Sequence, residues 1–418
     1  MPASPSTARA INDRLALRLL QREGPLTAGQ LKQLTGLSRP SVADLVERLT
    51  ASGLIEVVGE AGEQRRGPNA KLYGIVADRA RLAALDVRTE GVTVLVSDLV
   101  GRVLAEASVP IGGDTGTGTA VEQAVSLVER AAKEAEALGA PPREGFPAWG
   151  RLHTLAIGAP GLIDPASGEL RDSSGLPEWH RRLVAALQER FPDAHALVEN
   201  ETNLAALAEQ REGAARDRDT FVLLWLGHGT GAAVVLDGAL RRGASGGTGE
   251  IGFLPVPGTD GLPSATDCEG GFHSLAGSAA IAALAGEYGL TAHARSDEPV
   301  AAALVRAAVA RVAADAPETG AAARFLDALA DRLALGAASV VAVLDPGCVV
   351  LGGEVGQAGG EVLARRVARR LRRMAPLPTE VRPGTLGGGA VLRGALLTAR
   401  DAAQEELFGT AHGTAGAS

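Results

Sequence analysis

The sequence predicts an α/β protein in which a small N-terminal module precedes a larger body of two lobes. Residues 1–76 combine three short amphipathic helical patterns with two strand patterns, whereas residues 80–400 alternate apolar strand-like runs with long Ala/Leu/Val helical patterns. The chain has 418 residues, of which 46% are hydrophobic, so it is long enough for two or three domains with separate cores. We expect residues 409–418, which are rich in glycine, to form a flexible tail.

Three helices are predicted at the start of the chain. Leucines at helical spacing indicate the first helix, Asn12–Glu23. Thr27 is the expected N-cap of a second helix, which Gly36 ends. Ser38 is the expected N-cap of a third helix, Pro40–Thr50. The order helix, helix, tight turn, helix is typical of the helix-turn-helix motif.

Two strands, 54–58 and 71–75, follow these helices and enclose the loop 59–70. A hairpin in this position is the wing of a winged helix-turn-helix. Arg65 and Arg66 lie at its Gly/Pro-stiffened tip, which suits insertion into an A·T-rich minor groove. A solvated hairpin in a small protein-binding module is the alternative interpretation of the same pattern.

The start of the third helix is the part of such a module that enters the major groove. We therefore expect Arg39, Ser41 and Asp44 near base edges and Arg48 nearer phosphate. The residues predicted to contact double-stranded DNA are Ser38, Arg39, Ser41, Asp44, Arg48, Arg65, Arg66 and Lys71.

Charge divides the chain at the same boundary. Residues 1–76 hold 10 Lys and Arg against 7 Asp and Glu, and residues 77–418 hold 31 against 42, which gives net charges of +3 and −11. A basic head on an acidic body favours nucleic-acid contact by the head, although a randomly uneven surface explains the charges equally well.

The two cysteines, Cys268 and Cys348, match no metal-ligand spacing and lie far apart in the sequence, so we expect neither a disulfide framework nor a cysteine-rich metal site. The N-terminus has no apolar signal core, and no later stretch is apolar for long enough to cross a bilayer. We expect a cytoplasmic protein with no membrane partner and no cofactor.

The body begins with a predicted strand meander. Its apolar runs are 82–87, 92–97 and 103–109, with turn residues after the second run. The further predicted elements are a helix at 120–138, a strand at 154–158, an α/β unit at 222–240, helices at 299–316 and 321–342, and a strand at 348–351. Alternation on this scale favours two α/β lobes with a cleft between them.

Together with the winged head, six short motifs give the chain a resemblance to a known family. They are Gly158–Asp164 (GAPGLID), Leu176–Trp179 (LPEW), Val198–Asn203 (VENETN), Leu226–Gly231 (LGHGTG), Gly249–Gly252 (GEIG) and Leu351–Gly353 (LGG). In this order they resemble the ROK family, which joins sugar kinases and sugar-responsive repressors on the actin-like ATPase fold. The resemblance covers residues 15 to about 400 and implies an actin-like ATPase (ROK) body of two lobes.

The first phosphate loop departs from the kinase pattern. In the kinases of this family an Asp-x-Gly-x-Thr hairpin lets the backbone approach the ATP phosphates, which glycine permits. The matching residues here are Asp86–Glu90, where Arg88 replaces the glycine and Glu90 replaces the threonine. A carboxylate facing phosphate costs on the order of 1 to 4 kcal/mol at contact distance. These two substitutions argue against ATP binding, and Gly227–Gly231, the second phosphate loop, is interpreted as a structural turn rather than a nucleotide-binding loop.

The resemblance also suggests sugar-binding residues. Asn200 and Glu201 stand where the kinases have an Asn-Asp pair, and the extra methylene of Glu201 weakens catalysis more than binding. Glu250 matches a sugar-binding glutamate, and His273 stands where a further sugar-contacting glutamate is expected. A surface histidine is the alternative for His273. The predicted sugar-effector residues are thus Asn200, Glu201, Glu250 and His273.

No structural zinc is expected. The histidine ligand that follows the GEIG motif in the family is replaced by Phe253. The family's cysteine-rich zinc loop corresponds to residues 264–271, where Cys268 is the one cysteine. One cysteine cannot build a tetrahedral site.

These observations lead to three hypotheses. The first is a transcriptional regulator of the repressor type, a homodimer or homotetramer, that binds an operator through its head and a sugar or sugar phosphate effector through its body without phosphorylating it. The second is an active ATP-dependent sugar kinase with an appended head, against which Arg88, Glu90 and Glu201 argue. The third is a degenerate dimerisation scaffold that senses nothing.

Overall fold

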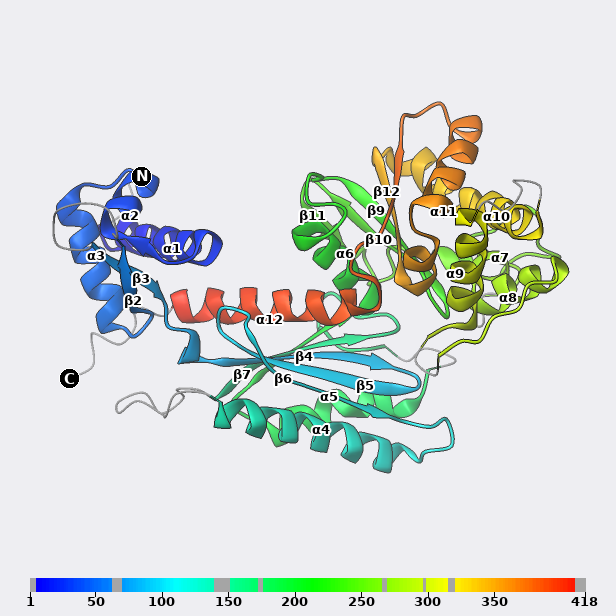
Figure 1. The fold of residues 1–418 in the computed structure, drawn as a ribbon. Helices are drawn as coiled ribbons and strands as arrows, with labels where there is room; N and C mark the ends of the chain where they lie inside the picture. The colour runs from blue at the N-terminus through cyan, green and yellow to red at the C-terminus, as the bar shows by residue number, and fades with distance from the viewer. Residues whose placement is uncertain are drawn as a thin grey trace.

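The computed structural model describes residues 5–61, 70–138, 151–171, 176–264, 269–295, 298–314 and 320–409. A small head lies at one end of the molecule, and a body of two lobes makes up the rest (Figure 1). The C-terminal helix α12, Ala390–Gly409, runs along the first lobe from the second lobe to the head.

The head is a winged helix-turn-helix, as predicted. Its elements are α1 (Pro5–Glu23), β1 (Leu26–Thr27), α2 (Ala28–Thr35), α3 (Arg39–Ala51), β2 (Ile55–Ala61) and β3 (Ala70–Ile75), with strand order β1-β3-β2. The predicted caps are confirmed. Thr27 and Gln30 form a capping box at the start of α2, Gly36 ends that helix with a φ of 71°, and the Ser38 side chain caps α3. The first helix begins before its predicted start at Asn12.

The first lobe is a mixed sheet with helices on both faces. Its elements are β4 (Arg81–Arg88), β5 (Gly91–Asp98), β6 (Val103–Pro110), α4 (Thr117–Ala137), β7 (Leu152–Ala159), α5 (Glu178–Arg190) and β8 (His195–Asn200). The strand order is β6-β5-β4-β7-β8, in which the predicted meander β4–β6 is antiparallel and β4, β7 and β8 are parallel. Helices α4 and α5 cover one face of this sheet, and α12 covers the other (Figure 1).

The second lobe is built on a sheet of order β11-β10-β9-β12-β13. Its elements are α6 (Glu201–Glu212), β9 (Phe221–Leu226), β10 (Thr230–Leu236), β11 (Ala239–Arg241), α7 (His273–Ala276), α8 (Ser278–Glu287), α9 (Val300–Ala313), α10 (Ala321–Leu344), β12 (Cys348–Gly352), α11 (Gly353–Met374) and β13 (Glu380–Pro383). Three short 3-10 helices, Ala77–Arg79, Ile251–Phe253 and Gly387–Gly389, complete the structure. Helices α7 to α11 lie on one side of the sheet and α6 on the other (Figure 1).

Helices α6 and α12 pack on each other between the two sheets. Their apolar side chains, including Leu204 and Leu396, belong to one buried cluster that also holds Phe221 of β9 and Leu17 of the head. The three parts of the molecule therefore share a continuous core. Helix α12 extends past residue 400, the predicted end of the body, to Gly409, and Leu407 and Phe408 are buried. The remainder of the predicted tail, 410–418, lies outside the described residues.

The buried side chain of Glu209 holds the chain segment that leads into α12. Its carboxylate is 1% exposed and accepts hydrogen bonds from the backbone N–H groups of Ala214, Thr385 and Leu386 at 2.7, 2.8 and 2.9 Å. A buried charge is tolerated when several donors satisfy it. These bonds hold the end of α6 against the segment that leads into α12.

Within the described ranges, each helix is too short or too polar to cross a membrane.

Candidate functional site

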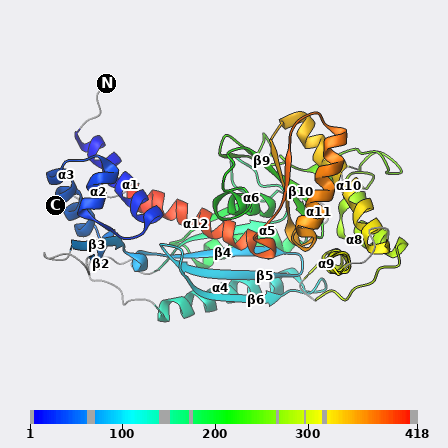
Figure 2. The ribbon, with the colours of Figure 1, turned by 45° about the horizontal axis from the view of Figure 1, so that its top comes forward.

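The predicted base-contacting residues lie at the start of α3. The Ser38 hydroxyl accepts from the Ser41 backbone N–H at 3.3 Å and lies 2.8 Å from the Ser41 hydroxyl, so both serines take part in capping. Arg39 is exposed, and no ion pair ties it to any other residue that the structure describes. Its guanidinium is therefore available to a partner outside the chain. In Figure 2 α3 lies at the end of the molecule that is remote from the second lobe.

Arg48 has a different environment. Its Nη2 lies 2.6 Å from Oδ1 of Asp13, a residue of α1 that is 2% exposed, and its Nη1 also binds Asp44. Two carboxylates thus neutralise this guanidinium and fix it to the first helix. The geometry favours a structural role for Arg48 and Asp44 over the predicted DNA contacts, because phosphate would compete with both carboxylates.

The wing is described in part. Lys71 is exposed on β3, where its backbone pairs in register with Glu60 of β2. Arg65 and Arg66, at the predicted wing tip, lie outside the described residues.

In the body, Asn200 and Glu201 stand where β8 passes into α6. Asn200 is the N-cap of α6, and its Oδ1 accepts from the Thr202 N–H at 2.9 Å. Its Nδ2 donates to the Glu201 carboxylate at 2.9 Å and to the Gly161 carbonyl at 3.1 Å. Asn200 therefore connects the loop Gly158–Asp164 of the first lobe to the first turn of α6.

Burial raises the pKa of Glu201 to about 8, and the nearby carboxylates of Asp86 and Glu250 act in the same direction. At neutral pH this side chain is therefore mainly an uncharged acid. In this form the carboxyl group can donate a hydrogen bond as well as accept one. Burial also raises the pKa of Glu250.

Glu250 follows a segment with two glycines, at which the backbone leaves no room for a side chain. Gly249 has a φ of 94°, and a Cβ there would lie 1.8 Å from the Ala232 carbonyl oxygen. A Cβ on Gly246 would lie 1.9 Å from the carbonyl oxygen of Ile163, in the first-lobe loop. The backbone of this second-lobe segment thus approaches the first lobe to within contact distance.

The structure brings Asn200, Glu201 and Glu250 together, and it places His273 on α7, which packs against the 3-10 helix that follows Glu250. His273 is half-buried at the start of α7, and burial lowers its pKa. Its ring lies against the backbone of Gly277, where a Cβ would be 2.9 Å from Cε1. Among the described residues, no hydrogen bond or ion pair joins His273 to the other three.

Two ion pairs cross between the lobes at the phosphate loops, and we call Arg88–Glu354 and Glu90–His228 the interlobe ion pairs. Arg88 Nη1 lies 2.7 Å from Oε1 of Glu354, at the start of α11. The same guanidinium binds Asp86 through Nε at 2.9 Å and the Gly388 carbonyl at 3.3 Å. Arg88 thus spans the gap that separates the first loop from the second lobe.

The second interlobe ion pair joins the two phosphate loops directly. Glu90 Oε1 lies 3.2 Å from Nε2 of His228 in the second loop. The hydrogen bond with His228 lowers the pKa of Glu90 to about 2, and the hydrogen bond with Glu90 raises the pKa of His228. Both side chains are about half exposed or more, so this pair contributes less to stability than the half-buried Arg88–Glu354 pair.

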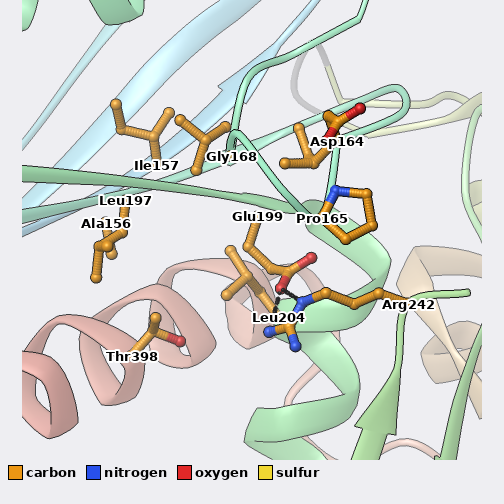
Figure 3. Close-up of a pocket in the computed structure, with 12 residues that line it drawn as sticks. Ala156, Ile157, Asp164, Pro165, Gly168, Leu197, Glu199, Leu204, Arg242 and Thr398 are labelled. Atoms are coloured by element: carbon orange, nitrogen blue, oxygen red, sulfur yellow. Dashed lines mark hydrogen bonds and ion pairs between the residues drawn. The ribbon is translucent and has the colours of Figure 1, made fainter. Parts of the chain in front are cut away.

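A cavity of about 200 Å³ has Glu199, the chain neighbour of Asn200, in its lining (Figure 3). The first-lobe loop that holds Asp164 and Pro165 forms one wall, and Arg242 of the second lobe reaches in from the opposite side. Arg242 Nη2 lies 2.6 Å from Oε2 of Glu199, whose other oxygen accepts from Asn203. None of the four predicted effector residues lines this cavity.

Sequence reasoning missed Glu199, Arg242 and Glu354 as interlobe contacts. Glu199 lies inside the VENETN motif, so its position was marked, whereas nothing in the sequence pairs it with Arg242.

Among the described residues, no three histidine, cysteine or carboxylate side chains gather as a metal site. Phe253 is half-buried in the 3-10 helix that follows Glu250. Cys268 lies outside the described residues, so the expected lack of zinc stays a prediction. Cys348 is a free, buried cysteine.

Comparison with known families decides the classification of the body. The ROK family model matches residues 145–402, more than half of the chain. The chain belongs to the ROK family. A MarR family model matches residues 11–67, which lie in the head.

This ROK family chain has both regulators and enzymes among its relatives. It is 27% identical over 256 residues to the DNA-binding transcriptional dual regulator NagC of Escherichia coli K12, a match that covers 59% of this chain and 58% of NagC. It is 35% identical over 219 residues to the bifunctional enzyme NanE/NanK of Brucella suis, covering 50% of this chain and 36% of the enzyme. The chain thus spans about three fifths or less of the length of these curated relatives.

The fold of the whole chain, head included, is shared with a solved structure. The crystal structure of a ROK family transcriptional regulator described as a homolog of the E. coli MLC protein superimposes with a TM-score of 0.72 at 21% identity, covering 97% of this chain and 98% of that one.

Proposed function

We propose that this protein is a DNA-binding transcriptional regulator of the repressor type, whose ROK body binds a sugar or sugar phosphate without phosphorylating it. The proposal also includes a homodimer or homotetramer that presents two heads to an operator, because helix-turn-helix proteins commonly bind paired half-sites. The winged head, the MarR match and the likeness to NagC support the DNA-binding part.

The observation that carries the proposal is the position of the interlobe ion pairs. Arg88 and Glu90 replace the residues with which the kinase loop admits phosphate, and both side chains are joined to the second lobe. For ATP to bind between these loops, the Arg88–Glu354 contact must break and leave the 12%-exposed Glu354 carboxylate beside phosphate. Like charges at this distance oppose binding. Glu201 also carries its carboxyl group one methylene further from the backbone than the aspartate of the kinase pattern, and such a displacement weakens catalysis more than binding.

The effector part of the proposal rests on the polar cluster at the start of α6. Asn200, Glu201 and Glu250 together offer an amide, an uncharged carboxyl group and a second carboxyl group. Sugar hydroxyls both donate and accept hydrogen bonds, so such a mixed set suits them. We keep His273 as a proposed peripheral contact, because its lowered pKa leaves a neutral ring with one donor and one acceptor.

The test has two measurements on the full-length protein. The first is fluorescence-anisotropy binding to DNA from the region upstream of its own gene at fixed salt, with a random duplex as control. The second is ATP consumption with a panel of sugars. We expect binding to upstream DNA at least about tenfold tighter than to the random duplex, and no sugar-dependent ATP consumption. Equal affinity for both duplexes would contradict the proposal that the protein is a transcriptional regulator.

The alternative function is an ATP-dependent sugar kinase with an appended head. The 35% identity to the Brucella suis bifunctional enzyme and the glycines of the second phosphate loop favour it. Sugar-stimulated ATP hydrolysis that Glu201→Gln abolishes would establish this alternative.

A further inference from the structure

A groove of about 470 Å³ lies where the head meets the body. It is bounded by α1 of the head, by α12, and by the end of α6. Five arginines line it, namely Arg14, Arg18, Arg22, Arg211 and Arg400. We call this hollow the arginine groove. None of these residues belongs to the predicted DNA or sugar contacts.

The carboxylates of the groove do not balance its arginines. Asp401 is shared, because its carboxylate lies 3.1 Å from Arg211 and 3.7 Å from Arg400. Glu405 is the other acidic residue in the lining. Five guanidinium groups against two carboxylates leave the lining with a net charge of +3.

Most of the excess positive charge lies on the head side of the groove. Arg14 and Arg18, one helical turn apart on α1, are exposed and form no ion pair with any residue that the structure describes. Arg22, a further turn along, pairs with its neighbour Glu23 at 2.7 Å. The same face of α1 thus points three positive charges at the body.

Arg400 shows that the body side also holds an unsatisfied hydrogen-bond donor. Its side chain is 17% exposed, and its buried Nε has no hydrogen-bond partner. Burial lowers the pKa of Arg400, because the protein around it opposes the charged form. A buried donor without a partner is uncommon in folded proteins.

We propose that the arginine groove binds a small phosphorylated anion that bridges α1 of the head to α12 of the body. Guanidinium forks match the oxygens of phosphate in geometry and charge. The volume of the groove is within the range of small-ligand sites. DNA backbone is the less favoured occupant, because α1 lies between the recognition helix α3 and α12 (Figure 2). The arginines of α1 line the groove together with residues of α12 rather than the surface near α3.

An anion bound in the arginine groove affects the position of the head relative to the body. Within the lining of the groove, α1 and α12 are joined by the hydrogen bond between Gln21 and Gln404 at 2.8 Å, and Gln404 also donates to the Leu99 carbonyl. An anion bound by arginines of both helices stabilises the arrangement in which they face each other. Any effect on DNA affinity rests on the proposed function, whereas binding of the anion does not.

The test is isothermal titration calorimetry of the full-length protein with inorganic pyrophosphate at constant ionic strength set with sodium chloride. Parallel titrations with inorganic phosphate and a hexose 6-phosphate distinguish a free phosphate from a phosphate ester, and the unphosphorylated hexose separates this groove from the sugar cluster. We expect Arg14→Gln/Arg18→Gln to weaken pyrophosphate binding about tenfold or more. Arg9→Gln, an exposed arginine of the same helix outside the groove, should leave it unchanged.

Arg400→Met provides a second variant on the body side, and thermal unfolding confirms that each variant is folded. Absence of binding above the chloride-matched buffer would overturn the proposal, as would equal binding by the double variant and the parent. A double variant that loses affinity and salt dependence for random duplex DNA, with pyrophosphate binding intact, would reassign the groove to DNA backbone. None of these results depends on an operator, so failure of the regulator proposal remains distinguishable.

Discussion

Glu201 is an acid whose folded environment opposes its charge. Because its pKa in the folded state is raised from 4.5 to about 8, the folded protein binds a proton that the unfolded chain has released between these pH values. The stability associated with this group is therefore fully present below about pH 4.5 and is lost as pH rises through about 8.

The first prediction concerns Glu201→Gln, which mimics the uncharged acid at every pH. The variant should match the parent in thermal stability at pH 4.5 and exceed it by a growing margin up to about pH 8 to 9. Differential scanning fluorimetry across this range measures the difference. A constant difference at all pH values would show that Glu201 titrates normally.

Arg88 gives the second prediction. Removing it leaves the 6%-exposed Asp86 side chain and the 12%-exposed Glu354 side chain without their cation. We expect Arg88→Ala to lower the free energy of unfolding by about 3 kcal/mol. Chemical denaturation of Arg88→Ala, Glu354→Gln and the double variant forms a cycle that isolates the pair. Additive effects would mean that the two residues do not interact.

At the residue scale, the sequence predicts what is local. The caps Thr27, Gly36 and Ser38 could be recognised because a cap depends on neighbours within one helical turn. The partners of Arg48 and Arg88 could not, since 35 and 266 residues separate them from Asp13 and Glu354. The sugar-site residues were predicted from the family resemblance. The raised pKa of Glu201 could not be predicted, because it depends on burial in the packed structure.

At the element scale, α3 combines two kinds of arginine. Arg39 is exposed at its start, whereas Arg48 joins its last turns to Asp13 of α1. Both were predicted from the sequence to contact DNA, Arg39 at base edges and Arg48 at phosphate, because both are basic residues of the same helix. Only the packing of α1 against α3 separates a side chain available to DNA from one that holds the head together.

The third prediction uses this contrast. Arg39→Ala should weaken binding to upstream DNA about tenfold, with relaxed sequence preference and unchanged thermal stability. Arg48→Ala should lower the free energy of unfolding by about 3 kcal/mol, because it leaves Asp13 buried and unpaired. Anisotropy and chemical denaturation on both variants give the two readouts. Reversal of the two effects would place Arg48, rather than Arg39, against DNA.

Helix α12 is one of several elements, with α5, α6 and α11 among them, that were not predicted from the sequence. Its alanines and leucines suit a helix, but its role follows from its position, where it packs on the first sheet, on α6 and on the head. The strand meander and the long helices of the second lobe were predictable because their apolar runs are long and regular. Helix α12 begins after a Gly-rich 3-10 turn and ends at a glycine, so its boundaries are poorly marked.

At the scale of the whole molecule, three devices connect the parts. The interlobe ion pairs join the lobes at the former phosphate loops, Glu199 and Arg242 join them beside the cavity in Figure 3, and α12 joins both to the head. A ligand that changes the separation of the lobes also shifts the first-lobe sheet and α6, on which α12 packs. We propose that sugar binding in the body changes DNA binding by the head through this continuous core.

The measurement that tests the central claim most directly is anisotropy of upstream DNA bound to the parent protein and to Glu250→Ala, titrated with sugars and sugar phosphates in the absence of ATP. The account predicts that one compound changes the DNA affinity of the parent by about fivefold or more, and that Glu250→Ala binds DNA equally well but does not respond. If no compound changes the affinity of the parent, or if Glu250→Ala responds as the parent does, the body does not sense a sugar through this site.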